Sequence, residues 1–393
     1  DFSPENIFAI SKRVNRLIKI FTSQSKSMGS KTYVVIDTLR NPFEALYFRE
    51  RYSAFYLMAI NTDDMTRKER LQKQYDLRDS QISTIDKKES NKLKSEYSDF
   101  VSQNIQKCYD LADIHVSNPQ LGTDDLSYLE WQLVKFIALI MHPGIIMPSS
   151  VERCMQIAHT AKLNSGCLSR QVGASITNNS FSIKAIGWNT PPEGQAPCSL
   201  RNVYDLLSHK DDKAFSKYEN NCQEFRSRVQ EIYNSESSKK NLSNLRGRNV
   251  AYCFKDIHNE IEHNKNQVHT RALHAEENAF LQIVKYGGQA ILGGKLFTTS
   301  SPCELCAKKA YQLGIKEIYY IDPYPGISTD HILNVGTTIP ELIMFSGAIG
   351  RAYHQLYEPI IPPKDEIKLI LKFQIKDYYR ELKLENENLK SKI

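Results

Sequence analysis

H-A-E at residues 274–276 and P-C-E-L-C at residues 302–306 are the two stretches that decide the fold of this chain. Cys303 and Cys306 stand three apart where a helix is expected to begin, so both sulfurs project to one side of its first turn. The positive end of a helix favours their thiolate forms. Two thiolates and the imidazole of His274 suit Zn²⁺, and three protein ligands leave a fourth tetrahedral position open, as in catalytic sites. The sequence therefore predicts a catalytic zinc site.

Glu276 lies two residues after the histidine and adds a carboxyl group that is not a ligand. Zinc lowers the pKa of a coordinated water toward about 7, and a neighbouring carboxylate can take the water proton and pass it on. The order H-x-E … P-C-x-x-C is that of zinc enzymes that remove the amine of cytosine or adenine. Cys-x-x-Cys alone would also fit a structural zinc or a redox pair. The joint pattern predicts a deaminase with Glu276 as proton shuttle.

The composition is that of an ordinary globular protein, with 41% hydrophobic and 24% charged residues in a chain of 393. A formal net charge of +6 suits a phosphorylated small molecule better than nucleic acid, whose binders cluster Lys and Arg. No apolar run approaches the roughly 20 residues of a membrane span, and the first residues have no signal-peptide pattern. Eight cysteines in a chain of this length do not indicate a disulfide framework. We therefore expect a protein of the reducing cytoplasm without membrane contact.

Residues 1–122 alternate helix and strand patterns, which indicates a parallel α/β domain. Strands are expected at Tyr33–Asp37, Phe55–Ile60 and Leu111–Val116, and helices over residues 4–21 and 42–52. This order, with Arg67 and Arg70 before the third strand, resembles the P-loop nucleoside-monophosphate kinases, whose arginines serve a lid over the phosphates. The loop G-x-x-x-x-G-K-[ST] is not found in the sequence. A structural or regulatory role is therefore favoured over kinase activity.

The zinc residues belong to a predicted domain at 149–355, which a linking helix within 123–148 precedes. A polar, largely helical insertion is expected at 199–268. The tail, 356–393, carries a charged amphipathic helix at 365–389 that either docks on a partner subunit or caps the domain. The remaining predicted elements are a hairpin of Ala174–Ile176 and Phe181–Ile186, a helix at 273–286, a strand at 295–299, a helix at 303–313 and a strand at 316–321.

The sequence around the zinc residues resembles the deoxycytidylate deaminase family. The matching segments are C-L-S-R-Q-V-G-A-S (167–175), G-W-N-T-P-P-E-G (187–194), H-A-E-E-N-A-F (274–280) and T-T-S-S-P-C-E-L-C-A-K-K-A (298–310). The resemblance implies a cytidine-deaminase-like three-layer α/β/α domain in which Asn189 binds sugar or base, Ser301 lies beside the attacked ring and Tyr324 helps to close the pocket. Arg170 and Arg351 are weaker candidates for phosphate contacts and fit equally well as surface arginines.

Members of that family often hold a second, structural zinc ion. The resemblance makes Cys167 and Cys198 candidates for this site, together with either His263 or His269. The alternative, that these are ordinary buried cysteines, has equal weight because the histidine spacing is ambiguous.

A kinase-like segment before this deaminase segment resembles the bacterial anti-phage deoxycytidine-nucleotide deaminases. That resemblance implies conversion of dCTP and dCMP to deoxyuridine forms, which depletes a phage of cytosine nucleotides, and it implies a homo-oligomer and a regulatory small RNA as partners. Two other functions stay open: deamination of a base in RNA or DNA, and a nucleotide-sensing regulatory protein with a vestigial site. The modest charge argues against the first, and the intact Glu276 argues against the second.

Overall fold

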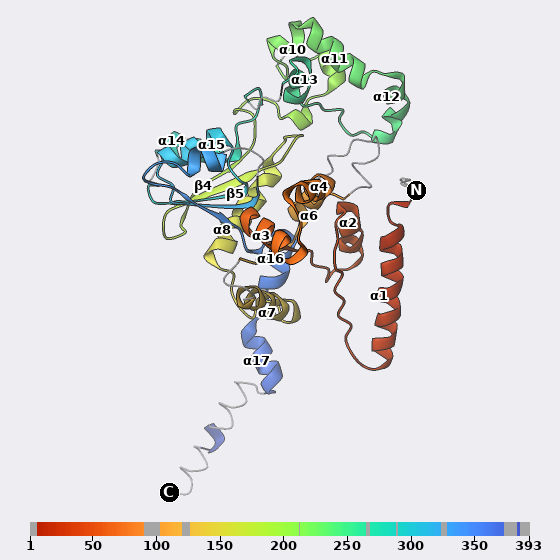
Figure 1. The fold of residues 1–393 in the computed structure, drawn as a ribbon, viewed down its shortest axis with the longest axis vertical. Helices are drawn as coiled ribbons and strands as arrows, with labels where there is room; N and C mark the ends of the chain where they lie inside the picture. Colours follow the sequence, from red (N-terminus) through yellow and green to blue (C-terminus); the bar gives the residue numbers. More distant parts are fainter. Residues whose placement is uncertain are drawn as a thin grey trace.

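The computed structural model describes residues 6–89, 103–119, 126–211, 213–264, 268–287, 290–323, 328–372 and 383–385 (Figure 1). None of the helices in these ranges has both the length and the apolar content that crossing a bilayer requires.

A five-stranded mixed sheet forms the centre of the predicted zinc domain, in the order β4-β3-β5-β6-β7. Its strands are β3 (Gly173–Thr177), β4 (Ile183–Trp188), β5 (Lys295–Ser300), β6 (Glu317–Asp322) and β7 (Glu341–Met344). β3 is antiparallel to both β4 and β5, whereas β5, β6 and β7 run parallel. The predicted hairpin and the two predicted strands after it are therefore confirmed.

Side-chain alternation along the strands divides the core between the two faces of this sheet. Leu296 of β5 packs with the helices α14 (Ala275–Lys285) and α15 (Glu304–Gln312), and the next residue, Phe297, packs with α8 (Ser150–Ala161). Figure 1 shows α14 and α15 on one side of the sheet and α8 on the other. The predicted three-layer α/β/α fold is confirmed, and α14 and α15 both lie on the face that carries the zinc residues.

A smaller sheet joins the N-terminal part of the chain to a distant segment. β1 (Met58–Asn61) pairs in parallel with β2 (Ile114–Ser117), and β8 (Gly347–Ala348) adds to β2 in the antiparallel direction. Apolar side chains of β2 pack there with α7 (Ser127–Met141) and α16 (Gly350–Tyr357). The second and third predicted strands of the N-terminal part are thus present and parallel, each shifted toward higher residue numbers.

The carboxylate of Glu152 in α8 joins the zinc domain to α7 and to β8 of the smaller sheet. α8 begins at Ser150 because Ser149 caps it: the Ser149 hydroxyl accepts from the Glu152 amide at 3.2 Å, and the Glu152 carboxylate accepts from the Ser149 amide at 2.9 Å. The same buried carboxylate accepts from Lys135 of α7 at 2.9 Å and from the backbone of Ala348 in β8 at 3.1 Å. One carboxylate therefore ties α7, α8 and β8 together.

The predicted strand Tyr33–Asp37 is wrong. The segment has no regular structure, and the Val35 side chain is 93% exposed. Its run of β-branched residues favours an extended backbone, but no strand among the described residues pairs with it. The arginines assigned to a kinase-like lid make contacts within the protein instead. Arg67 pairs with Asp86 at 2.9 Å, and Arg70 donates to the carbonyl of Asn118 at 3.1 Å.

Other helices of the N-terminal part and the tail agree in place with the prediction but differ in extent. The first helix, α1, spans Ala9–Ser27 instead of 4–21, and α17 spans Pro363–Leu371. Most of the predicted tail helix beyond residue 372 lies outside the described residues. The remaining helices of the N-terminal part are α2 (Pro42–Arg51), α3 (Asp64–Tyr75), α4 (Asp79–Glu89) and α6 (Ile105–Leu111).

The insertion is helical, as predicted, and has its own core. Figure 1 shows it as a separate helical layer beyond the sheet. Buried Arg201 lies between the rings of Phe215 and Tyr252, with its guanidinium carbon 5.0 Å from each centroid, and pairs with buried Glu219. Its helices are α9 (Val203–Leu207), α10 (Lys217–Asn221), α11 (Gln223–Tyr233), α12 (Glu236–Asn241) and α13 (Phe254–Ile261).

Candidate active site

The three predicted zinc ligands meet where two helices begin on the same face of the sheet. His274 is the N-cap residue of α14 and Cys303 that of α15. The Nδ1 atom of His274 lies 3.2 Å from the sulfur of Cys303 and 3.5 Å from that of Cys306. The three ligand atoms lie within 4.8 Å of one another, and this is the one such His, Cys, Asp or Glu group of three or more within the described ranges.

An ion pair between the two helices supports this arrangement. Glu277 of α14 pairs with Lys309 of α15 through one carboxylate oxygen, and the other accepts from the backbone amide of His274 at 3.4 Å. The same side chain therefore caps the helix that carries the histidine and links it to the helix that carries the cysteines.

The chemistry of the donors fits a zinc ion. Hydrogen bonds from the Cys306 thiol and from His274 lower the pKa of the Cys303 thiol to about 4, despite its burial. Its sulfur therefore carries the negative charge that a metal ligand needs at neutral pH. One thiolate, a second thiol beside it and an imidazole form a three-residue set typical of catalytic zinc.

Glu276 lies in the same pocket, and its side chain is removed from water. The residue is 4% exposed, and burial raises the pKa of its carboxyl group. Thr298 of β5 lies on the face of the strand that meets α14, and its hydroxyl is 3.1 Å from Oε1 of Glu276. Such a carboxyl group holds a proton more readily than one in water, which is the property that a proton shuttle needs.

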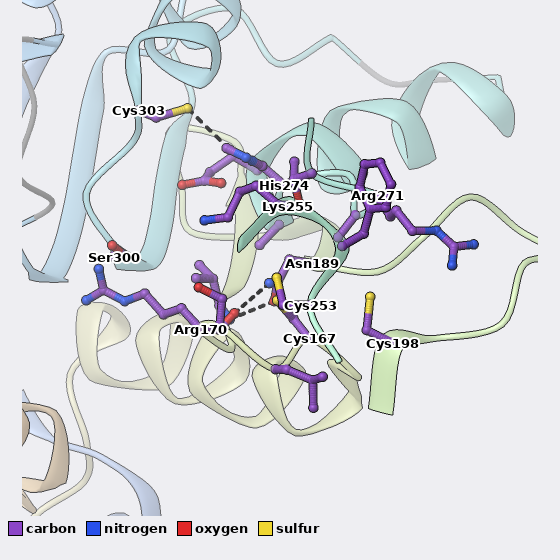
Figure 2. Close-up of a pocket in the computed structure, with 18 of the residues that line it drawn as sticks. Cys167, Arg170, Asn189, Cys198, Cys253, Lys255, Arg271, His274, Ser300 and Cys303 are labelled. Atoms are coloured by element: carbon purple, nitrogen blue, oxygen red, sulfur yellow. Dashed lines mark hydrogen bonds between the residues drawn. The ribbon is translucent and has the colours of Figure 1, made fainter. Parts of the chain in front are cut away.

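A cavity of about 160 Å³ opens beside the zinc residues (Figure 2). One wall consists of the segment after β4 and the loop before β3. The other wall comes from the end of the insertion and from the residues just before α14. The lining residues used below are Arg170, Asn189, Lys255, Arg271, Ser300 and Ser301.

Asn189 and Ser301 both line the cavity, and their roles in substrate binding stay predictions. Asn189 is 8% exposed, and both ends of its side chain are held: Oδ1 accepts from the Val172 amide at 2.8 Å, and Nδ2 donates to the Arg170 carbonyl at 2.7 Å. Asn189 thus fixes the loop before β3, which forms part of one wall of the cavity. Tyr324 lies outside the described residues.

The two arginines proposed for phosphate contacts behave differently. Arg170 lines the cavity and pairs with the buried carboxylate of Asp322. Arg351 is absent from the lining; its guanidinium donates to the Phe55 carbonyl at 3.0 Å and joins α16 to the N-terminal part. The structure therefore does not bring Arg351 to the active site.

The residues suggested for a second zinc are not assembled into a metal site within the described part of the chain. Cys167 and Cys198 both line the cavity. His263 is exposed, and His269 packs against His258 at a centroid distance of 4.5 Å. The second zinc site therefore stays a prediction from the resemblance.

Sequence reasoning missed the insertion's contribution to the pocket. Cys253, Phe254, Lys255 and Arg271 line the cavity although they are distant in sequence from Asn189. No local pattern marked them, because their position depends on how the insertion folds back over the sheet. The position of Thr298 could have been predicted from the sequence. It is two residues from Leu296 and so lies on the same strand face, which packs on α14.

Part of the chain is similar to known deaminases. The chain is 28% identical over 172 residues to the deoxycytidylate deaminases of Enterobacteria phages T2 and T4, covering 43% of this chain and 78% and 76% of theirs. Among solved structures, the dCMP deaminase of cyanophage S-TIM5, crystallised with dCMP and dUMP, aligns with a TM-score of 0.31 and 23% identity, over 51% of this chain and 99% of that one. The sequence model of the cytidine and deoxycytidylate deaminase zinc-binding region matches residues 148–322, which contain His274, Glu276, Cys303 and Cys306, and the prediction of a zinc-dependent cytosine deaminase agrees with this match.

Proposed function

We propose that the protein hydrolyses the exocyclic amine of free deoxycytidine nucleotides, dCMP or dCTP, to give the deoxyuridine nucleotide and ammonia. One observation carries the proposal: a buried carboxyl group, Glu276, lines a small cavity together with His274 and Cys303, which form one ligand set with Cys306. The relatives named deoxycytidylate deaminase support this class of substrate.

Two proton transfers are required when the C4–N bond breaks and a C4–O bond forms. When bound by the three ligands, Zn²⁺ supplies a nucleophile by lowering the pKa of a coordinated water toward about 7. Glu276 would take one proton of the attacking water on its carboxylate and give it to the ring nitrogen; it would then take the proton of the new C4 hydroxyl group and give it to the amine, which leaves as ammonia. Thr298 holds the carboxyl group in place from β5 at 3.1 Å.

The lining of the cavity favours a free nucleotide over a base within a polymer. Phe254 and Lys255 of the insertion and Arg271 of the segment after it line the pocket together with Asn189. A base in RNA or DNA would enter with its flanking nucleotides, which would have to lie against these residues.

The role of this reaction in the cell stays a prediction from the resemblance. Depletion of deoxycytidine nucleotides during phage infection, a homo-oligomeric assembly, a small-RNA regulator and a cytoplasmic location belong to that prediction. The kinase-like nature of residues 1–122 also stays a prediction, with a structural role favoured.

An assay of ammonia release with dCMP, dCTP, CMP, cytidine and a cytosine-containing oligonucleotide tests the proposal. We expect turnover of a deoxycytidine nucleotide and none of the oligonucleotide. The Glu276→Gln variant should retain zinc but lose at least about 100-fold in kcat, because a positioned acid–base group contributes about that much. Preferred turnover of the oligonucleotide, or a variant with near-normal kcat, would overturn the proposal.

A further inference from the structure

The loop before β3, residues 165–172, forms part of one wall of the catalytic cavity, and we call it the pocket loop. It has neither helix nor strand along its length, so its position depends on the contacts that its backbone and side chains make. Five of its residues line the cavity: Cys167, Leu168, Ser169, Arg170 and Val172. A shift of the pocket loop therefore changes the space that a substrate can occupy.

Two attachments hold the pocket loop. Asn189 binds its backbone, as described above, and the Arg170 side chain attaches it to β6. Arg170 pairs there with Asp322, the last residue of β6, which is 1% exposed. Figure 2 shows the Arg170 guanidinium on the side of Ser300, the residue of β5 that is paired with Asp322 in the sheet. The second attachment thus lies at the end of two neighbouring strands.

Asp322 also supports the segment that leads to the zinc ligand Cys303. Its backbone carbonyl accepts from the Ser301 amide at 2.8 Å, and Ser301 lines the cavity. Asp322 itself does not line the cavity. It therefore contacts two parts of the cavity wall without facing the substrate.

The other carboxylate oxygen of Asp322 is bound by the N-terminal part of the chain. Gln106 of α6 donates to Oδ1, whereas Arg170 pairs with Oδ2. Asn104 caps the start of α6, since its side chain accepts from the Lys107 amide at 2.9 Å. The cap fixes the first turn of the helix, which carries Gln106.

Tyr109 anchors α6 on the smaller sheet. Its hydroxyl accepts from the Asn61 side chain of β1 at 2.7 Å, and its ring lies 4.8 Å from that of His115 in β2, between centroids. Asn61 and His115 are both buried. Because α6 cannot shift without breaking these contacts, the smaller sheet determines where Gln106 lies.

A second side chain of α6 interacts with Arg170. Asp110 lies four residues after Gln106 and so on the same face of the helix. Partial burial raises the pKa of the Asp110 carboxyl group, and the positive charge of Arg170 lowers it. The guanidinium of the pocket loop therefore interacts with a carboxyl group of the N-terminal part as well as with Asp322.

We propose that α6 positions the pocket loop through Asp322, so that the N-terminal part of the chain determines how tightly the deaminase pocket holds its substrate. Gln106 and Asp322 are positioning residues, because neither lines the cavity. The inference rests on the proposed function for its substrate, and it gives residues 1–122 a role in the catalytic site.

The first test measures kcat and KM for dCMP in wild type and in Gln106→Glu. The variant places a carboxylate against Asp322, and the exposed position of residue 106 should leave folding intact. We expect KM to rise at least about fivefold and kcat to change less than about twofold, since a looser wall weakens binding while the zinc ligands and Glu276 keep their places. Gln106→Lys keeps a donor for the same oxygen and should have a KM within about twofold of wild type. Gln103→Glu, the same exchange at an exposed position just before α6, is the matched control and should behave as wild type.

Hydrogen exchange of the amides in residues 165–172, followed by mass spectrometry, measures the hold on the pocket loop without any turnover. Exchange should become at least about tenfold faster in Gln106→Glu and stay unchanged in Gln103→Glu. Asp322→Asn removes the charge that holds Arg170 and should change loop exchange and KM in the same direction as Gln106→Glu.

Unchanged loop exchange in Gln106→Glu would overturn the inference. So would faster exchange with an unchanged KM, or a fall in kcat alone. If wild type does not deaminate dCMP, the Kd for dCMP from calorimetry takes the place of KM. A weaker Kd together with faster loop exchange in Gln106→Glu would then keep the inference, while the proposed function would be rejected.

Discussion

The hydroxyl of Thr298 lies between two oxygen atoms, 3.1 Å from Oε1 of Glu276 and 2.8 Å from the carbonyl of Ser300. A hydroxyl has one proton, and a carbonyl can only accept. Thr298 therefore shares its one proton between the Glu276 carboxylate and the Ser300 carbonyl. Burial raises the pKa of Glu276, and the hydrogen bond that Thr298 donates lowers it. The strand thus orients the carboxyl group and opposes the effect of its burial.

Replacement of Thr298 by Val should reduce kcat by about tenfold with little change in KM, because Glu276 loses the group that orients it. The free energy of unfolding should fall by about 1–2 kcal/mol, since the Ser300 carbonyl loses its donor. Steady-state kinetics and chemical denaturation measure the two effects. Thr298→Ser keeps the hydroxyl and should retain most of kcat. A Thr298→Val variant with wild-type kcat would show that Thr298 does not orient Glu276.

Loss of one zinc ligand should release the metal. His274→Ala and Cys303→Ala each leave two ligands of the three, and we expect zinc content by elemental analysis to fall below about one tenth of the wild-type level. Cys108→Ala, which alters a buried cysteine of α6 far from the ligand set, should retain full zinc. Full occupancy in either ligand variant would exclude that residue from the metal site.

Gly187 allows α14 to approach the sheet closely. A Cβ atom at this position of β4 would lie 2.2 Å from the Ala275 carbonyl oxygen and 2.5 Å from the Ala279 amide nitrogen, both backbone atoms. Gly187→Ala should therefore push α14 outward and lower the free energy of unfolding by about 1–3 kcal/mol or more. Because α14 begins at the zinc ligand, kcat should fall as well.

Thermal unfolding and steady-state kinetics check the Gly187 variant. Gly194 is a suitable comparison, because a side chain there meets nothing within 4 Å and its φ of +86° is one that Asn tolerates. Gly194→Asn should change stability by less than about 1 kcal/mol. A Gly187→Ala protein as stable and active as wild type would show that the close approach is not needed.

Buried His115 and half-buried His159 should make the protein less stable in mild acid. Burial lowers the pKa of His115 to about 3 and that of His159 to about 4, from 6.5 in both cases. The unfolded chain takes up protons first, so this contribution is complete above about pH 6.5 and is lost as the pH falls toward 4. Each group then removes about 2 kcal/mol by pH 5.

Urea denaturation at pH 8 and at pH 5 measures this dependence. His115→Gln carries no titratable ring, so the difference between the two pH values should shrink by about half. An undiminished difference would place the acid sensitivity elsewhere in the chain.

Local sequence patterns were sufficient for the core of the candidate site. The spacing of Cys303 and Cys306 at a helix start, and of His274 and Glu276 at another, already defines the chemistry, because helix geometry alone places those side chains. The same holds for the β3–β4 hairpin, whose turn and alternation are local. The segment Tyr33–Asp37 shows the limit of that reasoning: β-branched residues predict a strand only if a partner strand is near.

Residues close together in the chain were enough to predict the zinc ligand set, the role of Glu276 and the order of strands and helices from β3 to β6. The completion of the N-terminal sheet by β8 and the place of Lys255 in the lining of the pocket could not be predicted in this way. Both result from contacts between segments more than 60 residues apart in the chain. Such contacts depend on the free energy of packing the whole molecule, which no local spacing records.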